Sequence, residues 1–165
     1  MVDQTYDVEV EREFDASIER VWQAWTTPAD LRAWWGPQGF TCPRAEADVR
    51  PGGSIIVTMK APPEWGGSEH HSRWDITDAV APTLLRYIHR FCDAEGRAVT
   101  ATEAGIPPGV PDENHHQVVL VDLGDGRTRL EMVEHGYFTA EARDLSADGL
   151  EQCLEKMAAL VERAV

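Results

Sequence analysis

Apolar residues recur three and four positions apart near the end of the chain, from about residue 139 to residue 165. Polar and charged side chains fill the positions between them. The apolar positions are Leu150, Cys153, Leu154, Met157, Leu160 and Val161. This spacing predicts an amphipathic helix with one apolar stripe. Because most of the preceding chain reads as short strands, we expect the stripe to cover a sheet in an α+β domain.

The start of the chain predicts one strand followed by two short helices. Residues 6–14 alternate in character, as expected of a strand. Ser17 is a suitable N-cap for the first helix. The second helix is expected to start at Pro28, with Thr27 as its N-cap and Asp30 in the position that a capping box gives to its acid.

The middle of the chain predicts further antiparallel strands separated by turns. We expect them at 54–60, 71–80, 84–92, 116–123 and 128–135. The last two form a predicted hairpin around the turn at 124–126. Proline and glycine are frequent at 62–70 and 105–114, which are therefore expected to be loops.

The chain length and charge restrict the class of protein. Its 165 residues predict one domain, 1–165. A net charge of −14 argues against nucleic acid or an anionic membrane surface as a partner. There is no apolar run of the length of a membrane span and no signal-peptide pattern. Three cysteines without paired spacing fit a reducing cytosol, so we expect a cytoplasmic protein.

Alternation along the predicted strands indicates which side chains share the inner face of the sheet. That face is aromatic and rich in methionine, as small-molecule cavities often are. Its larger members are Met59, Trp74, Tyr87, Phe91 and Met132. His89 and Glu134 are in phase with them. An inner face of this composition is also typical of a filled core, and both interpretations stay open.

Other patterns that carry chemistry are weak. His70-His71 and His115-His116 are adjacent pairs, and neighbours on a strand point to opposite faces. We therefore predict no metal site. The chain contains no phosphate-binding loop, no GxGxxG and no GxSxG, so no cofactor is expected.

Several segments together resemble a known family. They are the strand–helix segment at 11–40, the turn at 48–53, the strand start at 128–130, and Gly149-Leu150 with Leu154. The most specific combination is Trp34-Trp35 before Gly36-Pro37, followed by the Pro-Gly-Gly turn. These residues resemble the stand-alone bacterial relatives of the C-terminal domain of the activator of heat-shock-protein-90 ATPase. That branch belongs to the SRPBCC superfamily, which has the START-like, birch-pollen-allergen-like helix-grip fold.

The resemblance implies an α+β helix-grip fold with two short helices after the first strand. A curved antiparallel sheet of six or seven strands would wrap around a long C-terminal helix over an internal cavity. Superfamily members bind lipids, sterols, polyketides and other hydrophobic molecules, and some cyclise or hydrolyse them. Leu150 stands where the family often has an aromatic residue, a difference that bears on cavity size.

We therefore expect the chain to bind a small hydrophobic or aromatic molecule without covalent chemistry. The expected lining residues are Trp35, Met59, Trp74, Tyr87, His89, Phe91, Met132, Glu134, Leu150 and Met157. Two alternatives stay open. One is a cyclase- or hydrolase-like enzyme with His89 or Glu134 as general base. The other is a protein-interaction module that docks a partner, chaperones included, through its acidic surface or Trp65. The oligomeric state, monomer or homodimer, stays open as well.

Overall fold

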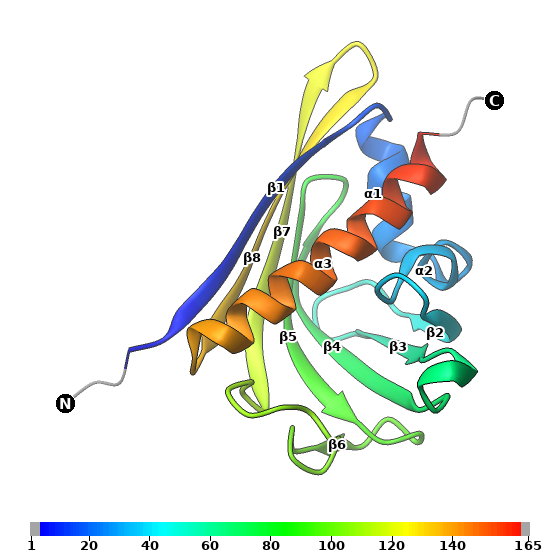
Figure 1. The fold of residues 1–165 in the computed structure, drawn as a ribbon. Coiled ribbons are helices and arrows are strands. Elements are labelled where there is room, and N and C mark those ends of the chain that lie inside the picture. The colour runs from blue at the N-terminus through cyan, green and yellow to red at the C-terminus, as the bar shows by residue number, and fades with distance from the viewer. Residues whose placement is uncertain (1–3, 163–165) are drawn as a thin grey trace.

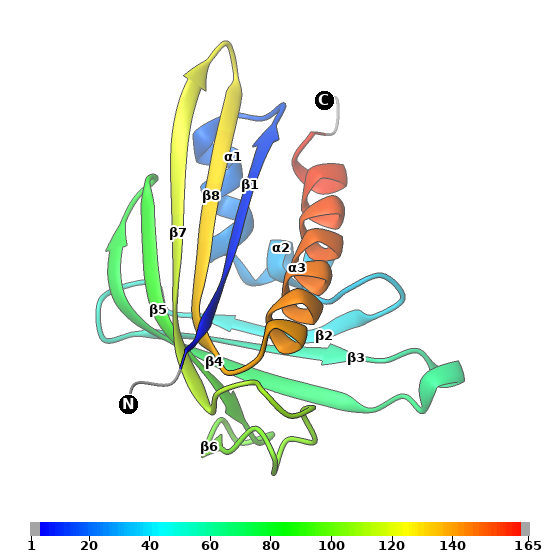
Figure 2. The same ribbon diagram turned by 60° about the vertical axis from the view of Figure 1, so that its left-hand side comes forward.

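A curved antiparallel sheet and one long helix across its concave side make up most of the protein (Figures 1 and 2). The computed structural model describes residues 4–162. Its elements, in chain order, are β1 (Tyr6–Phe14), α1 (Ile18–Thr26), α2 (Pro28–Trp34), β2 (Thr41–Ala47), β3 (Ser54–Lys60), η1 (Pro63–Trp65), β4 (Glu69–Val80), β5 (Leu84–Cys92), β6 (Ala98–Val99), β7 (Glu113–Gly124), β8 (Arg127–Tyr137) and α3 (Ala140–Val161). The predicted α+β helix-grip fold is confirmed.

The strands follow the order β1-β8-β7-β5-β4-β3-β2, and the two-residue β6 pairs with β5 beside this path. The main path thus has seven strands, in agreement with the six or seven expected. The short β6 is an additional strand. The sequence prediction also missed β2. This strand lies at the edge of the sheet, where Pro43 is tolerated because one side of an edge strand needs no ladder hydrogen bonds. Its buried side chains are small, Cys42 and Ala45, and give little apolar signal.

The hairpin between β7 and β8 confirms the predicted turn. Only Asp125 and Gly126 lie between the two strands, and both have positive φ, 55° and 74°. Positive φ at both central residues is the conformation that two-residue type I′ hairpin loops require. The two predicted loops are shorter than expected, because β4 already starts at Glu69 and β7 at Glu113.

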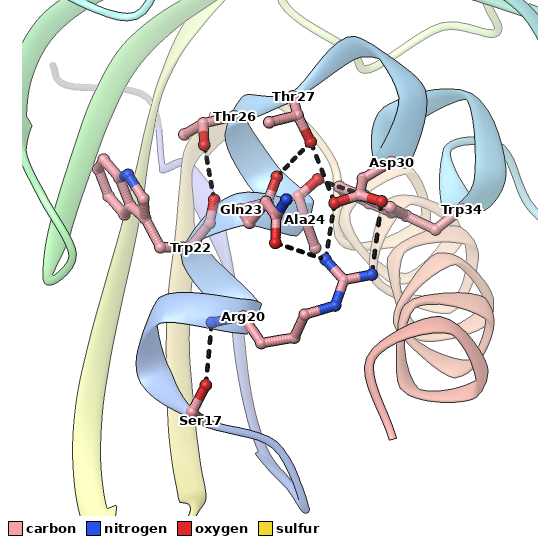
Figure 3. Close-up of polar contacts among 9 residues, drawn as sticks. All are labelled: Ser17, Arg20, Trp22, Gln23, Ala24, Thr26, Thr27, Asp30 and Trp34. Atoms are coloured by element: carbon pink, nitrogen blue, oxygen red, sulfur yellow. Dashed lines mark hydrogen bonds and ion pairs between the residues drawn. The ribbon is translucent and has the colours of Figure 1, made fainter. Parts of the chain in front are cut away.

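The two short helices hold each other through side-chain contacts that Figure 3 shows. Ser17 accepts a hydrogen bond from the backbone N–H of Arg20, as its predicted N-cap role requires. The second helix starts at Pro28 with Thr27 in the N-cap position, as expected, but the capping box predicted there is wrong. The Thr27 hydroxyl reaches back to the carbonyl of Gln23 at 2.7 Å and to Asp30 at 3.0 Å, so it does not cap α2. Asp30 instead pairs with the Arg20 guanidinium at 2.7 Å.

Tryptophans fill one end of the interior. The indole N–H of Trp34 donates to the carbonyl oxygen of Ala24 at 2.7 Å, which fixes α2 against α1 (Figure 3). Trp25 packs edge-on against Trp34 with ring centroids 4.9 Å apart, and Trp74 stacks on Tyr87 at 4.7 Å. All four rings are buried. This tryptophan core belongs to the same hydrophobic cluster as Leu154 and Met157 of α3, both of which are fully buried.

Candidate functional site

A cavity of about 300 Å³ lies between the concave face of the sheet and the first half of α3. Side chains from β3, β4, β5, β7, β8 and α3 form its wall, together with residues 35–37 after α2 and parts of the loop at 106–110. The volume lies at the lower end of the range of small-molecule sites, about 300–1,000 Å³. Most of the lining side chains are apolar, and β7 and β8 contribute four of the polar ones, Asn114, His116, Glu134 and Tyr137.

Six of the ten predicted lining residues lie on the cavity wall. They are Trp35, Met59, His89, Phe91, Glu134 and Leu150. The other four are Trp74, Tyr87, Met132 and Met157, which are buried in the packed core instead. Strand period two correctly gave the inner face of the sheet for those of the ten residues that lie on strands. It could not show where along each strand the tryptophan core ends and the cavity begins.

Small side chains on α3 are the reason why the cavity exists. Ser146, Gly149 and Cys153 follow at helical spacing and all line the cavity. A Cβ atom added at Gly149 would have no heavy atom within 4 Å outside its own helical turn. Further along the same helix, Leu154 and Met157 are fully buried in the packed core. The helix therefore packs tightly at one end and leaves a hollow at the other.

The loop at 106–110 closes one side of the cavity and is fixed at two points. The backbone N–H of Phe138 donates to the carbonyl oxygen of Gly109 at 2.8 Å. Gly109 has a φ of +98°, and a Cβ there would lie 2.4 Å from the Thr139 hydroxyl oxygen. At the far end of the loop, the Asp112 carboxylate accepts from the backbone N–H of Ala101 at 2.8 Å. The chain at Gly109 thus passes too close to the start of α3 for any side chain.

A second hollow of about 210 Å³ lies beside the cavity and shares part of its wall. Ile106, Val110, Leu145 and Ser146 line both spaces. The remaining residues of the second hollow come from the prolines at 107–108 and the first turns of α3. Because Leu145 is 66% exposed, this shared wall connects the cavity region with the surface.

Polar groups form one end of the cavity. The Tyr137 hydroxyl donates to Oε1 of Glu134 at 2.6 Å, and both residues are buried. Nδ1 of His116 lies 3.3 Å from the Tyr87 hydroxyl and 3.7 Å from Oε2 of Glu134. The sequence left open whether His89 lies beside Glu134, and the structure places a different histidine there. His116 is the histidine beside the carboxyl group, and His89 stacks on His116 with ring centroids 5.0 Å apart.

Burial shifts the pKa values of these groups toward their uncharged forms. It lowers the pKa of His116 and of His89 from 6.5 to about 3, so both imidazoles are neutral at pH 7. Burial also raises the pKa of Glu134, an effect that the hydrogen bond from Tyr137 opposes. The His116–Glu134 contact is therefore no ion pair, and at 3.7 Å it is too long for a hydrogen bond.

Two buried nitrogen atoms of the cavity wall have no hydrogen-bond partner within residues 4–162. They are Nε2 of His116 and Nδ2 of Asn114; the Asn114 amide lies near the Tyr137 hydroxyl but without the geometry of a hydrogen bond. Both side chains are 7% exposed. The strand register places Asn114 opposite His89 and His116 opposite Glu134, so these groups share one part of the inner face.

Sequence reasoning missed Asn114 and His116 as site residues. The signal was available in the strand pattern. Extending the alternation back from Val118 and Leu120 on β7 puts His116 and Asn114 on the same inner face. The adjacent His115 is exposed on the opposite face, as the sequence predicted for neighbouring histidines.

The described residues offer little other chemistry. Burial raises the pKa of the Cys153 thiol to about 11, so this cavity cysteine is protonated at pH 7 and a poor nucleophile. Between residues 4 and 162 we find no group of three or more potential metal ligands. No helix in the same range is long and apolar enough to cross a membrane.

Trp65, the residue considered for protein docking, lies on the surface and is 63% exposed. Its ring packs against Phe40, with centroids 6.0 Å apart. It also covers Gly39, where an added Cβ would lie 3.2 Å from the indole ring. These contacts give Trp65 a structural role in holding η1 against the segment after α2.

Comparison with known proteins supports the resemblance inferred from the sequence. The family model described as Activator of Hsp90 ATPase homolog 1-like protein matches residues 15–162. None of the curated proteins matches the chain.

Solved bacterial structures share the fold over nearly the whole chain. A protein of Chromobacterium violaceum is 28% identical with a TM-score of 0.77, covering 96% of this chain and 98% of its own. A protein of Mycobacterium smegmatis is 25% identical with a TM-score of 0.74, at 98% and 93% coverage. The AHSA1 protein of Silicibacter pomeroyi is 22% identical with a TM-score of 0.73, at 94% and 96% coverage. The last shows likeness of fold alone.

Proposed function

The chain belongs to the family of Activator of Hsp90 ATPase homolog 1-like proteins, and we propose that it binds a small, largely apolar molecule in the cavity between the sheet and α3. One observation carries this proposal. The apolar cavity ends at two buried polar nitrogens, on Asn114 and His116, that have no partner within residues 4–162. A buried polar group without a partner costs about 1–3 kcal/mol, and a bound molecule that pairs with it would remove that cost.

Binding is favoured over covalent catalysis by the state of the polar groups. A nucleophile needs an activated side chain, and the Cys153 thiol is held in its protonated form. A general base needs a pKa near the working pH, whereas burial lowers the pKa of both cavity histidines to about 3.

Glu134 supports a second candidate function, a cyclase- or hydrolase-like enzyme. Burial raises the pKa of its carboxyl group, as in carboxylic acids that act in general acid–base catalysis. Replacing Glu134 by Gln separates the two functions. An enzyme that uses this group loses turnover by about 10²–10⁴-fold, whereas a binding protein loses affinity only modestly.

The proposed binding is tested with N-phenylnaphthylamine, an uncharged probe that becomes fluorescent in apolar sites. We expect saturable binding to the unmodified chain. Gly149→Leu should abolish it, because the added side chain enters the open space at Gly149. Glu151→Leu places the same side chain on the exposed face of α3 and should bind normally. Equal binding by both variants would mean that the probe sits elsewhere and the proposal is wrong.

A further inference from the structure

The cavity wall carries no positive charge at pH 7. No lysine or arginine within residues 4–162 lines it, and its two histidines are neutral. The nearest candidate is Lys156, one turn beyond Cys153 on α3. Its ammonium group is already used, since Nζ donates to the carbonyl oxygens of Gly36 at 2.9 Å and Phe40 at 3.2 Å.

This charge distribution disfavours anionic ligands. A carboxylate or phosphate that leaves water needs a cation or several hydrogen-bond donors to replace its hydration. The polar end of the cavity offers Glu134, itself an acid, and the hydroxyl of Tyr137, which already donates to it. A second acidic group placed there would find no cation and no free hydrogen-bond donor from either residue.

Cationic ligands are also disfavoured. An ammonium group would have to reach Glu134, whose Oε1 is taken by Tyr137 and whose Oε2 lies 3.7 Å from His116. Burial raises the pKa of Glu134 and so weakens its negative charge as a partner.

The two unpaired nitrogens define what the ligand has to provide. Nδ2 of Asn114 is a donor and requires an acceptor. Nε2 of His116 donates or accepts depending on which ring nitrogen carries the proton. The two residues are two positions apart on β7 and face the same side of the sheet, so one small polar group can reach both.

We infer that the ligand is an uncharged molecule with an apolar, ring-sized body and one terminal group that both donates and accepts hydrogen bonds, such as a hydroxyl or a primary carboxamide, held between Asn114 and His116. This inference rests on the proposed binding function. It excludes fatty-acid-like anions and amines as the preferred class of ligand.

Three naphthalene derivatives of equal size test the inference. Naphthamide is neutral, naphthoate is an anion and naphthylmethylamine is a cation near neutral pH. Each is measured on the unmodified chain by its displacement of N-phenylnaphthylamine and by calorimetry. We expect naphthamide to bind at least about ten-fold more tightly than either charged probe, the difference that one unsatisfied buried group produces.

A variant then locates the contact. Asn114→Leu should lower the affinity for naphthamide about ten-fold, and this loss should exceed any change in the affinity for N-phenylnaphthylamine, which carries no carboxamide. His115→Leu, on the outer face beside the site, should change neither affinity. Because the three-probe comparison uses the unmodified chain, it decides the question even if Asn114→Leu fails to fold.

The outcomes separate the two proposals. Tighter binding of naphthamide that is lost in Asn114→Leu supports both. If N-phenylnaphthylamine binds but naphthoate or naphthylmethylamine equals naphthamide, the inference is overturned and the binding function stands. If no probe binds in the cavity, both proposals fail.

Discussion

The imidazole rings of His89 and His116 stack face to face across two neighbouring strands, with centroids 5.0 Å apart and an angle of 9° between the planes. Two neutral rings can pack in this way inside a protein. Two imidazolium ions could not, because like charges at this distance repel strongly where water is excluded. The stacked pair therefore makes the protein sensitive to acid.

We predict that the free energy of unfolding decreases as the pH falls below 6.5. Between pH 6.5 and about 3 the unfolded chain protonates His116 and the folded chain does not. The loss is at most about 1.4 kcal/mol per pH unit for one such group. Glu134 acts in the opposite sense above pH 4.5, because its raised pKa makes the folded chain hold a proton longer. Urea unfolding between pH 7 and pH 5 measures the slope.

A matched pair of variants assigns that slope. His116→Gln should give a flatter dependence on pH than the unmodified protein, whereas His115→Gln, on the exposed outer face, should keep the original slope. Both variants retain Glu134, and each removes one histidine, so they differ in whether the inner or the outer imidazole is lost. An unchanged slope in His116→Gln would show that its imidazole is not held neutral.

We predict that Gly149→Ala stabilises the protein by about 0.5–1 kcal/mol. Glycine inside a helix is destabilising by this amount relative to alanine. A Cβ at this position meets no other atom within 4 Å, so no clash offsets the gain. Thermal unfolding should show a higher midpoint. A lower midpoint would mean that the space beside Gly149 is already filled.

Gly109→Ala should have the opposite effect and destabilise the protein by about 1–3 kcal/mol. The left-handed backbone is strained with a side chain, and the new Cβ would clash with Thr139. Gly105→Ala is the control, because Gly105 has a φ of +75° but no atom within 4 Å of an added Cβ. Urea unfolding measures the free energy of unfolding of both variants. A larger decrease for Gly109→Ala is the cost of the clash with Thr139 beyond that of backbone strain. Equal decreases would show that the clash has no effect.

Trp34→Phe should cost about 3 kcal/mol of stability, since it removes buried apolar volume and the hydrogen bond to the Ala24 carbonyl. Trp65→Phe changes an exposed ring and should cost less than about 1 kcal/mol. The comparison is made by chemical denaturation. Similar decreases in the free energy of unfolding for both variants would show that the buried Trp34 contributes no more to stability than the exposed Trp65.

Most of the helices and strands could be predicted from the spacing of apolar residues, because that spacing is a property of each segment by itself. The α3 stripe, the Ser17 cap and the β7–β8 hairpin each depend on a few adjacent residues. β2 escaped prediction because its stability comes from pairing with β3 and not from its own side chains. The capping box predicted at Thr27 was wrong because its hydroxyl hydrogen-bonds to the carbonyl of Gln23 in α1 and not to α2.

The candidate site was only partly predictable. Alternation correctly placed Glu134 and His89 on the inner face of the sheet. Whether an inner residue meets a cavity or a neighbour depends on which side chains arrive from elsewhere in the chain. Tyr87 and His89 differ by two positions on β5, yet Trp74 stacks on Tyr87 and buries it in the core, while His89 reaches the cavity. Contacts between residues from different strands cannot be read from the sequence around either residue.

One part of α3 lies beside the cavity and another part is packed in the core, and this has a consequence for the evolution of the protein. Substitutions at Ser146, Gly149 and Cys153 alter the shape of the hollow, while the tryptophan core at the other end continues to hold the fold. The shape of the hollow thus depends mainly on these three small residues, while Leu154 and Met157 of the same helix lie in the packed core. A single nucleotide change in the codon for such a small residue would therefore change the shape of the hollow while most of the folding free energy is retained.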